Sequence, residues 1–391
     1  MLLSGHDPRM GTASPFLVEK KINTFTIAFV KNKVRKNRAM LKILFAPLQG
    51  YTTGIYRKAH AETFGGVDAY YAPFLRIENG KPREKDLRDL EIANAECAGF
   101  AGKNCAGSAD ENCASTAESD SLEGNAREIP QIIANSVDEF KILADALIAK
   151  GYTEIDFNMG CPFPMQVNRH RGAGILSDKQ AVQQIMDEIR KRSSAENGTA
   201  NANGTAPVKF SVKMRLGQNS PDEAFALLPI LNEAPLSQIT LHPRLGKQQY
   251  KGAIDFKSFE KFYAECRHPL VYNGDITSVS QICEMERKYP KLAGVMIGRG
   301  MLARPSLAAE YKGFANCDAS LNCADKILQI HQVIFDHACK TYQGDSQILS
   351  HVLSFWEYLE PSIPKKIFKK IKKAGKLSEY QEAIMEMRGL S

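Results

Sequence analysis

The stretch GYTEIDFNMGCPFPMQVNRHRGAG, residues 151–174, decides the fold prediction for this chain. Its apolar-rich segment 154–158 is typical of a short buried strand, and the turn that follows contains Cys161. In a (β/α)₈ barrel, catalytic groups lie at the C-terminal ends of the strands. A cysteine there can exchange a proton, because its pKa is easily shifted around neutrality. The alternative is that Cys161 is a small buried hydrophobic residue, as most free cysteines are.

A basic loop follows the cysteine, with Arg169, His170 and Arg171 in succession. It ends in the glycine-containing segment 172–174, where we expect the backbone to approach a ligand closely.

The same alternation of strand and helix continues on both sides of this stretch. Strands are predicted near residues 43, 68, 131, 155, 210, 239, 271 and 295, and each but the second is followed by a clear helical pattern. Eight such units predict an α/β fold, a TIM (β/α)₈ barrel over residues 42–318. An open doubly wound sheet is the alternative, but it should not need eight strands. Only helical patterns follow, at 323–341, 346–359, 364–373 and 377–388, which predict a small all-helical C-terminal domain over residues 319–391.

Three segments do not fit this rhythm. Residues 1–41 form a basic N-terminal extension that we expect to be poorly ordered, and one hypothesis is that translation starts at Met40. Residues 95–125 and 193–206 are polar, low-complexity sequences typical of surface insertions. The first contains three cysteines spaced by eight residues. Zinc sites favour spacings of two to four, so we predict no metal site.

Composition indicates a soluble globular protein, with 43% hydrophobic and 24% charged residues among 391. No run approaches the ~18 to 20 apolar residues of a membrane span, and no secretory signal is evident at the N-terminus. Nine cysteines are too few and too irregular for a disulfide framework in a chain of this length. We therefore predict a cytoplasmic protein.

The net charge of +7 is concentrated at the two ends of the chain. Residues 1–41 contain eight basic and two acidic residues, and residues 361–391 contain eight basic and three acidic ones. Basic ends on a body of opposite net charge predict a polyanionic partner that is held away from the core. The alternative is an ordinary solvated helix face.

Seven of the eight predicted strand ends carry polar or backbone-exposing residues, which predicts one shared cavity. These residues are Pro47, Leu48 and Gln49; Gln131; Asn158 and Cys161; Lys213 and Arg215; His242 and Arg244; Asn273, Gly274 and Asp275; and Gly298, Arg299 and Gly300. The glycine-containing ends of the last two strands are where many barrels bind phosphate, and Arg299 can add a charge-assisted contact. Lys213 suits the anionic charge of a reduced flavin, and Gln131 and Asn158 suit the amide edge of a heterocycle. The alternatives are an ordinary ion pair for Lys213 and a satisfied loop histidine for His242.

Seven motifs in order resemble the tRNA-dihydrouridine synthase family. They are APLQG (46–50), PQIIAN (130–135), DFNMGCP (156–162), VKMRLG (212–217), LHPRLGKQQYKG (241–252), NGDI (273–276) and IGRG (297–300). The segment HVLSFWEYL (351–359) is similar to that family's tRNA-binding domain.

The resemblance implies FMN-dependent reduction of the C5–C6 double bond of specific tRNA uridines, with NADPH as the reductant. NADPH would reduce FMN, a hydride would pass to C6, and Cys161 as catalytic acid would protonate C5. The positions that match FMN contacts are Pro47, Leu48, Gln49, Gln131, Lys213, His242, Asn273, Gly274, Asp275, Gly298 and Arg299. We predict Asn158, Arg215 and Arg244 as substrate-binding residues, residues 319–391 as the tRNA-binding domain, and a monomer.

Two departures from the family pattern stand out. Leu48 replaces the usual methionine, and Phe163, Pro164 and Met165 follow the Cys-Pro pair, where the family has small or basic residues. Two other functions remain as alternatives. One is another FMN barrel acting on pyrimidines, such as a dihydroorotate dehydrogenase-like enzyme, and the other is a catalytically inactive RNA-binding homologue.

Overall fold

The computed structural model describes residues 40–94, 127–194, 207–313 and 322–389. The chain divides into the segment Met1–Met40 and the compact unit Leu41–Ser391. Almost all of the predicted N-terminal extension, the whole insertion at 95–125 with its three cysteines, and most of the insertion at 193–206 lie outside the described residues.

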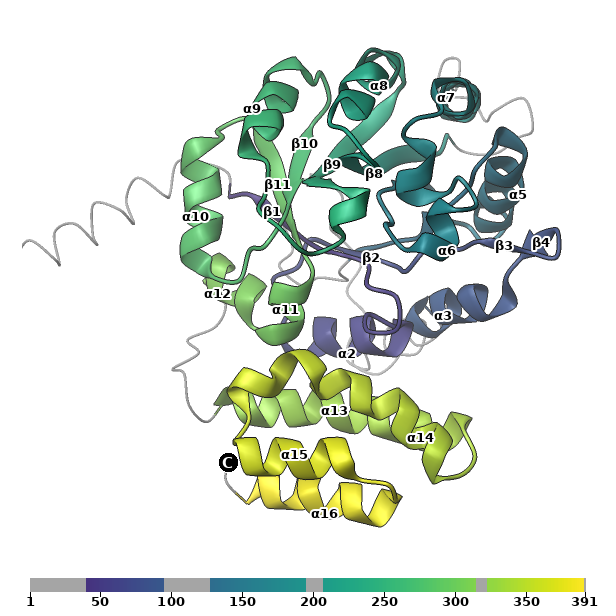
Figure 1. Ribbon diagram of the computed structural model, residues 1–391. Coiled ribbons are helices and arrows are strands. Elements are labelled where there is room, and N and C mark those ends of the chain that lie inside the picture. Colours follow the sequence, from purple (N-terminus) through teal and green to yellow (C-terminus); the bar gives the residue numbers. More distant parts are fainter. Residues whose placement is uncertain (1–39, 95–126, 195–206, 314–321, 390–391) are drawn as a thin grey trace, which may run out of the picture. The chain divides into compact units, whose positions relative to one another are not determined.

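A parallel barrel forms the centre of the unit Leu41–Ser391 (Figure 1). The strand order is β5-β2-β1-β11-β10-β9-β8-β7-β6, and every neighbouring pair is parallel. The strands are β1 (Lys42–Phe45), β2 (Ala69–Tyr71), β5 (Arg127–Ile129), β6 (Gln131–Ile132), β7 (Glu154–Met159), β8 (Lys209–Gly217), β9 (Leu236–Leu245), β10 (Leu270–Asn273) and β11 (Leu292–Ile297).

The barrel closes at Pro130. This residue separates β5, which pairs with β2, from β6, which pairs with β7. Proline has no backbone N–H to donate to a ladder, but the carbonyl of Pro130 accepts a hydrogen bond from the Asp156 N–H at 2.9 Å. The two short strands therefore occupy one position of the barrel. The predicted TIM (β/α)₈ barrel is confirmed, with its third strand in two parts.

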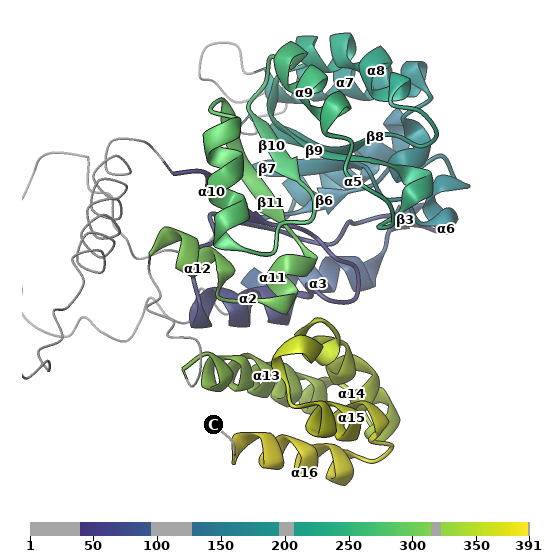
Figure 2. The same cartoon turned by 60° about the vertical axis from the view of Figure 1, so that its left-hand side comes forward.

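Helices follow the strands and cover the outside of the barrel (Figure 2). They are α2 (Gly54–Thr63), α5 (Val137–Ile148), α7 (Lys179–Ser193), α8 (Asp222–Glu233), α9 (Phe256–Glu265), α10 (Val279–Lys288), α11 (Arg299–Ala303) and α12 (Leu307–Lys312). One helix was predicted at 302–312, where the structure has two. Pro305 lies between them and lacks the N–H that a continuous helix needs.

The segment after β2 contains structure that was not predicted. A short hairpin of β3 (Ile77–Glu78) and β4 (Lys81–Pro82) leads into helix α3 (Glu84–Asn94). This helix is polar over most of its length, so its sequence lacks the apolar stripe that identifies an amphipathic helix. Helix α3 thus follows the second strand, where the sequence showed no clear helical pattern.

Aromatic packing joins the Cys161 strand to its helical cover. Phe140 of α5 meets Phe157 of β7 edge to face, with ring centroids 5.5 Å apart, and lies 5.6 Å from Phe210 of β8. All three side chains are fully buried. Each such burial stabilises the fold by about 1.5–3 kcal/mol, so β7 is held firmly in the barrel wall.

The C-terminal region is helical, as predicted. It comprises α13 (Asn322–Thr341), α14 (Asp345–Val352), the 3₁₀ segment η4 (Leu353–Ser362), α15 (Lys365–Lys373) and α16 (Leu377–Arg388). Trp356 is fully buried at its centre, where its Nε1–H donates to the Tyr380 hydroxyl at 2.7 Å. Trp356 is therefore a core residue, as expected. The predicted domain boundary at 318/319 falls outside the described residues and stays a prediction.

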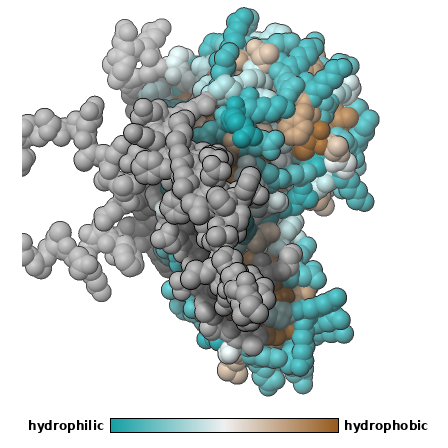
Figure 3. Space-filling view, turned by 90° about the vertical axis from the view of Figure 1, so that its left-hand side faces the viewer, coloured by the Kyte–Doolittle hydropathy of each residue, from teal (hydrophilic) through white to brown (hydrophobic). Residues whose placement is uncertain are grey.

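The described surface is largely hydrophilic in the view of Figure 3, apart from the atoms hidden behind grey ones. None of the helices in the described ranges is long and apolar enough to cross a lipid bilayer.

Candidate active site

A cavity of about 780 Å³ lies at the C-terminal ends of the barrel strands. This volume falls within the roughly 300–1,000 Å³ that small-molecule and cofactor sites occupy. The predicted site residues gather around it: Pro47, Leu48, Gln49, Gln131, Asn158, Cys161, Lys213, Arg215, His242, Asn273, Gly274, Asp275, Gly298 and Arg299. Arg244 is the exception, because it does not line the cavity.

The turn that carries Cys161 is fixed by Asn158. The side-chain oxygen of Asn158 accepts hydrogen bonds from the backbone N–H groups of Gly160 (3.0 Å) and Cys161 (2.9 Å). Its amide nitrogen donates to Oε1 of Gln131 at 2.6 Å, and Gln131 in turn donates to Asp156 at 2.7 Å. Both amides line the cavity, but they are already bonded within the protein. These side-chain hydrogen bonds join β6 to β7 next to the Cys161 turn.

The glycine-containing segment packs against the cysteine itself. Gly172 has a φ of +60°, and a Cβ there would lie 2.7 Å from the carbonyl oxygen of Cys161 and 2.8 Å from its Cβ. The close neighbour of this backbone is Cys161, and residues 172–174 do not line the cavity, so its predicted approach to a ligand stays a prediction. The next residue, Ala173, donates its N–H to the Cys161 carbonyl at 2.9 Å.

The basic loop before this segment is anchored by Arg171. Its side chain is buried, and its Nε donates to Oε2 of Glu139 at 2.9 Å, with a second ion-pair contact between the same residues. Arg169 and His170 are exposed. The loop therefore has one structural arginine and two residues free to face solvent.

Cys161 is buried and borders the cavity at the same time. It is 7% exposed and packs with Phe74 and Ile133. Burial raises the pKa of the Cys161 thiol, while the backbone N–H of Phe163 and the charges of Arg215 and Lys213 act in the opposite direction to a smaller extent. The thiol consequently keeps its proton at neutral pH, as a proton donor must.

Lys213 is a cation without a partner. Burial, together with the nearby charge of Arg215, lowers the pKa of Lys213 to about 8. Within the described part of the chain, its ammonium makes no hydrogen bond or ion pair. The alternative of an ordinary ion pair therefore fails. An unpaired ammonium in a partly buried site is costly, so the cavity favours an anionic ligand beside it.

Arg215 lies two residues beyond Lys213 on the same strand. Its Nε donates to the Gly160 carbonyl at 3.0 Å, and one terminal nitrogen donates to the Leu245 carbonyl at 3.0 Å. The guanidinium thereby joins the cysteine turn to the end of β9.

His242 is held neutral. Burial lowers the pKa of His242 well below 6.5, and Arg215, Lys213, Arg244 and Arg299 lower it further. A terminal nitrogen of Arg244 lies 3.3 Å from Nε2 of His242. Because a guanidinium only donates, Nε2 accepts and the ring proton is on Nδ1. The Nδ1–H of His242 is therefore a possible donor to a ligand. The alternative of a loop histidine that is satisfied within the protein applies to Nε2, which has Arg244 as its partner.

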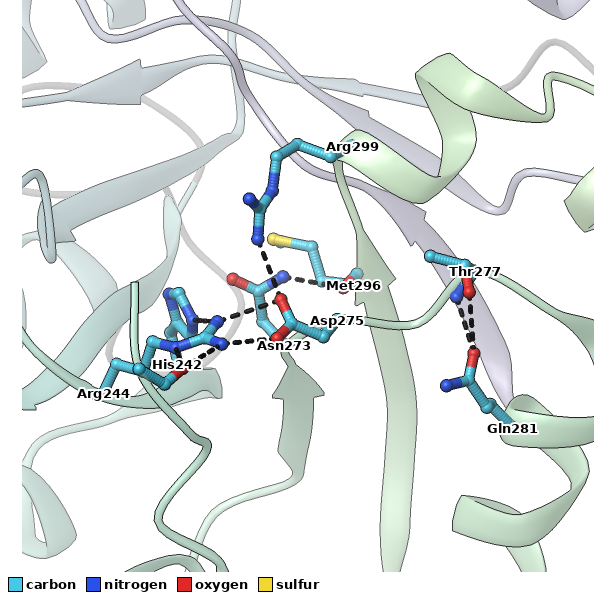
Figure 4. A network of polar contacts seen from close by, with 9 residues as sticks. His242, Arg244, Asn273, Asp275, Thr277, Gln281, Met296 and Arg299 are labelled. Carbon is cyan, nitrogen blue, oxygen red and sulfur yellow. Dashed lines mark hydrogen bonds and ion pairs between the residues drawn. The ribbon is translucent and has the colours of Figure 1, made fainter. Parts of the chain in front are cut away.

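Two arginines share the carboxylate of Asp275 (Figure 4). Arg244 donates to both oxygens, one of them at 2.9 Å, and Arg299 donates to Oδ1 at 2.8 Å. The hydrogen bonds from Arg244 are the main reason that the pKa of Asp275 lies below its usual value. Two guanidinium groups and one carboxylate leave this cluster positive.

The predicted substrate contact of Arg244 has no support in this geometry. Besides Asp275, its guanidinium donates to the Gly252 carbonyl at 2.7 and 3.1 Å. Arg244 orients Asp275 and His242 from behind the cavity wall.

Several cavity residues were not predicted: Tyr51, Phe163, Tyr250, Glu357, Tyr358 and Glu360. The Tyr250 ring lies beneath two guanidinium groups, 4.7 Å from that of Arg299 and 5.6 Å from that of Arg215. Its position in the motif at 241–252 could have identified it from the sequence.

Glu357, Tyr358 and Glu360 belong to η4 and reach the barrel only through the tertiary fold. The Tyr51 hydroxyl, for example, donates a hydrogen bond to Glu357 at 2.9 Å.

The residues of the cavity fit a planar, anionic, phosphorylated group. The unpaired ammonium of Lys213 and the net positive cluster around Asp275 favour negative charge at two separate places. Gly298 keeps the end of β11 open, because a Cβ there would meet Leu48 at 3.1 Å. Among the described residues, no group of three or more His, Cys, Asp or Glu side chains could hold a metal ion.

A nearly closed parallel barrel, whose cavity at the strand C-termini is lined by both polar and apolar residues, is the architecture of (β/α)₈ enzymes. A family model described as dihydrouridine synthase matches residues 109–386, which is more than half of the chain. The chain belongs to the dihydrouridine synthase family, a family of flavin-dependent oxidoreductases. The match does not reach Pro47, Leu48 or Gln49.

Individual relatives agree with this assignment. The chain is 26% identical over 278 residues to a tRNA-dihydrouridine(16) synthase of Neisseria meningitidis serogroup A, covering 70% of this chain and 72% of that protein. It is 32% identical over 154 residues to a probable tRNA-dihydrouridine synthase of Helicobacter pylori, covering 39% and 42%.

The similarity to solved structures is low. A histamine dehydrogenase from Rhizobium sp. 4-9 matches with a TM-score of 0.47 and 10% identity, over 75% of this chain and 49% of that one. Morphinone reductase matches with a TM-score of 0.45 and 10% identity, over 73% and 91%. Because both scores are below 0.5, the fold assignment depends on the strand order itself.

Proposed function

We propose that this protein reduces the C5–C6 double bond of specific uridines in tRNA to 5,6-dihydrouridine, with FMN as cofactor and NADPH as reductant. The observation that carries the proposal is the pairing of a protonated Cys161 with an unpartnered Lys213 on one cavity, in a member of the dihydrouridine synthase family. The names of the relatives supply the tRNA substrate.

The eleven residues predicted to contact FMN all line the cavity, which supports their assignment. In this proposal, Arg299 and the backbone at Gly274 and Gly298 hold the phosphate, while Arg244 keeps Asp275 and Arg299 in position. Lys213 places its positive charge beside the isoalloxazine ring. A bound flavin supplies the hydride that reaches C6 of the uracil ring.

Cys161 donates the proton to C5. Its raised pKa keeps the proton on sulfur until the substrate takes it. The thiolate that remains is stabilised by the positive charges of Arg215 and Lys213, which both lower the thiol pKa. Asn158 and Gly172 keep the turn in place on either side, so the sulfur does not have to reorganise during the transfer.

The helical region 319–391 is proposed to hold the tRNA. One face of α15 is buried through Ile367, Phe368 and Ile371, and the other presents six exposed lysines: Lys365, Lys366, Lys369, Lys370, Lys372 and Lys373. Such a face attracts a phosphate backbone. The predicted cytoplasmic location and monomeric state are part of this proposal.

Mapping dihydrouridine in tRNA tests the proposal directly. A strain from which the gene is deleted should lack dihydrouridine at one or a few tRNA positions, and the purified holoenzyme with NADPH should restore it in that tRNA. Turnover of free dihydroorotate or uracil, without any on the unmodified tRNA, would favour the dihydroorotate dehydrogenase-like alternative. Tight tRNA binding by a protein whose flavin NADPH does not bleach would favour the inactive homologue.

A further inference from the structure

An exposed aromatic side chain stands at the edge of the cavity. Phe163 follows Cys161 by two residues, lines the cavity and is nevertheless 51% exposed. Isolated exposed hydrophobic residues on a protein surface need no special explanation. This one is distinguished by its place beside the proposed proton donor.

The backbone of Phe163 is fixed in that place. Its carbonyl accepts from the N–H groups of Gln166 (2.9 Å) and Val167 (3.0 Å). Phe163 is the N-cap residue of the short helix α6 (Pro164–Val167), whose first residue is a proline. Proline at this position restricts the backbone to helical angles, which holds Phe163 at the start of this helix and at the edge of the cavity.

The loop that follows Phe163 exposes an arginine, Arg169, to solvent. The Arg169 carbonyl accepts a hydrogen bond from the Asn135 side chain at 3.0 Å, which ties the backbone of this loop to the segment after β6. Exposed aromatic rings are the groups on which RNA-binding proteins stack unstacked bases, and basic side chains bind the phosphate backbone beside them.

We propose that Phe163 stacks on the base next to the uridine that is reduced, and fills the gap that this uridine leaves in its stack. The inference depends on the proposed function. A uridine must leave its stack before its C5 and C6 atoms reach the cavity, and this deprives the neighbouring base of its stacking partner. The Phe163 ring replaces that partner. Phe163 is thus a positioning residue, which stabilises the extruded nucleotide without touching the reacting atoms.

Two RNAs distinguish this role from a purely structural one. The first is the unmodified target tRNA, and the second is the same tRNA with abasic residues on both sides of the target uridine. Wild-type holoenzyme is compared with Phe163→Ala, Phe163→Trp and the control Met165→Ala. Met165 lies on the same turn and is 68% exposed, but it does not line the cavity.

On the intact tRNA, Phe163→Ala should lower kcat/KM about ten- to a hundredfold, which corresponds to about 1.4–2.8 kcal/mol. Phe163→Trp should retain most of the activity, and Met165→Ala should match the wild type. On the abasic tRNA, wild type and Phe163→Ala should be equal, because no base remains to stack on. The rate at which NADPH reduces the bound flavin should be the same in all variants.

Three results with an active wild type would overturn the inference: unchanged kcat/KM for Phe163→Ala on intact tRNA, an equal loss on both RNAs, or slower flavin reduction by NADPH. The second and third would mean that Phe163 supports Cys161 or the cofactor instead. A wild-type enzyme that forms no dihydrouridine on the intact tRNA would refute the proposed function itself.

Discussion

Lys213 gives the site a pH dependence whose direction follows from its environment. Its pKa of about 8 in the free protein means that the ammonium is charged at pH 7 and mostly neutral at pH 9. In the proposed site the anion beside Lys213 is the ring of the reduced flavin, which favours the charged ammonium, so reduced FMN should bind more weakly as the pH rises through 8. The limit is a tenfold rise in its dissociation constant per pH unit. Anaerobic equilibrium dialysis of the apoprotein against reduced FMN between pH 6.5 and 9.5 measures this.

Lys213→Arg is the matched control for that measurement, because a guanidinium stays charged throughout this range. Its dissociation constant should be nearly independent of pH. The other nearby groups change charge little around pH 8, since the guanidinium of Arg215 stays protonated, burial and the nearby positive charges lower the pKa of His242 so that it is neutral, and burial raises the pKa of Cys161. A wild-type dissociation constant that stays flat to pH 9.5 contradicts the placement of Lys213 beside an anion.

At this scale the sequence predicted which residues would meet, but not how they are bonded. Cys161, Lys213 and His242 were found because each ends a strand of a recognisable barrel. That Asn158 points its oxygen back at the Cys161 turn could not be predicted, because an amide at a strand end can bond a ligand or the protein equally well. The bonds that Arg244 makes within the protein could not be predicted for the same reason, since its partner Asp275 lies 31 positions away in the chain.

At the scale of elements, the loop after β7 holds the cysteine by close packing at Gly172. Replacing Gly172 with alanine places a methyl group 2.7 Å from the Cys161 carbonyl and adds strain at a positive φ. Overpacking of this kind costs about 1–3 kcal/mol. Chemical denaturation should therefore show that the free energy of unfolding falls by that amount in addition to the cost of backbone strain. The Cys161 turn should also shift.

Gly151→Ala measures the backbone strain alone, so the difference between the two variants gives the part of the loss that is due to packing. Gly151 also has a positive φ, at +87°, but a Cβ there meets nothing within 4 Å. Its substitution should cost about 1–2 kcal/mol from backbone strain. If the two variants are equally stable, Gly172 does not serve to pack the loop on Cys161.

Strong periodicity decided which elements were predicted correctly. Strands such as β7 and β8 alternate apolar with polar residues, and the helix after β6 begins at Ser136, whose side chain accepts a hydrogen bond from the Glu139 N–H. The hairpin β3–β4 and the helix α3 carry no such pattern and were missed. The division of one strand at Pro130 was also missed, because it depends on the two different partners of its halves.

At the scale of the whole molecule, the lysines of α15 should govern the affinity for tRNA. Lys369 and Lys373 are exposed on this helix. The double variant Lys369→Ala/Lys373→Ala should bind tRNA more weakly, and the slope of log K against log salt concentration should fall by about 0.7–0.9 for each phosphate that is no longer neutralised. Stability should stay within about 0.5 kcal/mol, because both side chains are on the surface.

Lys179→Ala is the control, because Lys179 is an exposed lysine on α7 of the barrel, outside the proposed tRNA-binding region. It should leave both affinity and salt slope near the wild-type values. A loss of binding free energy from Lys179→Ala that is half that of the double variant would mean that binding follows overall charge, and that the basic face of α15 has no special role.

The joining of the helical region to the barrel could not be predicted from the sequence. Glu357 and Tyr358 were predicted only as parts of a helix and Glu360 only as part of the C-terminal domain, yet all three line the cavity. The Tyr358 ring meets that of Tyr51 edge to face at 5.1 Å. Such interactions join residues about 300 positions apart, and no local pattern records them. The proposed tRNA-binding region thus contributes directly to the cavity in which the chemistry is proposed.

The central claim is that Cys161 protonates the uracil ring of a tRNA nucleotide while the cofactor is bound in the same cavity. Its most direct test is the single-turnover rate of flavin reoxidation after reduced holoenzyme is mixed with unmodified tRNA. Cys161→Ala should bind flavin and be reduced by NADPH like the wild type, but its reoxidation by tRNA should be slower by about a hundredfold or more. Reoxidation at the wild-type rate would contradict the claim, and so would a variant that fails to fold or to retain flavin.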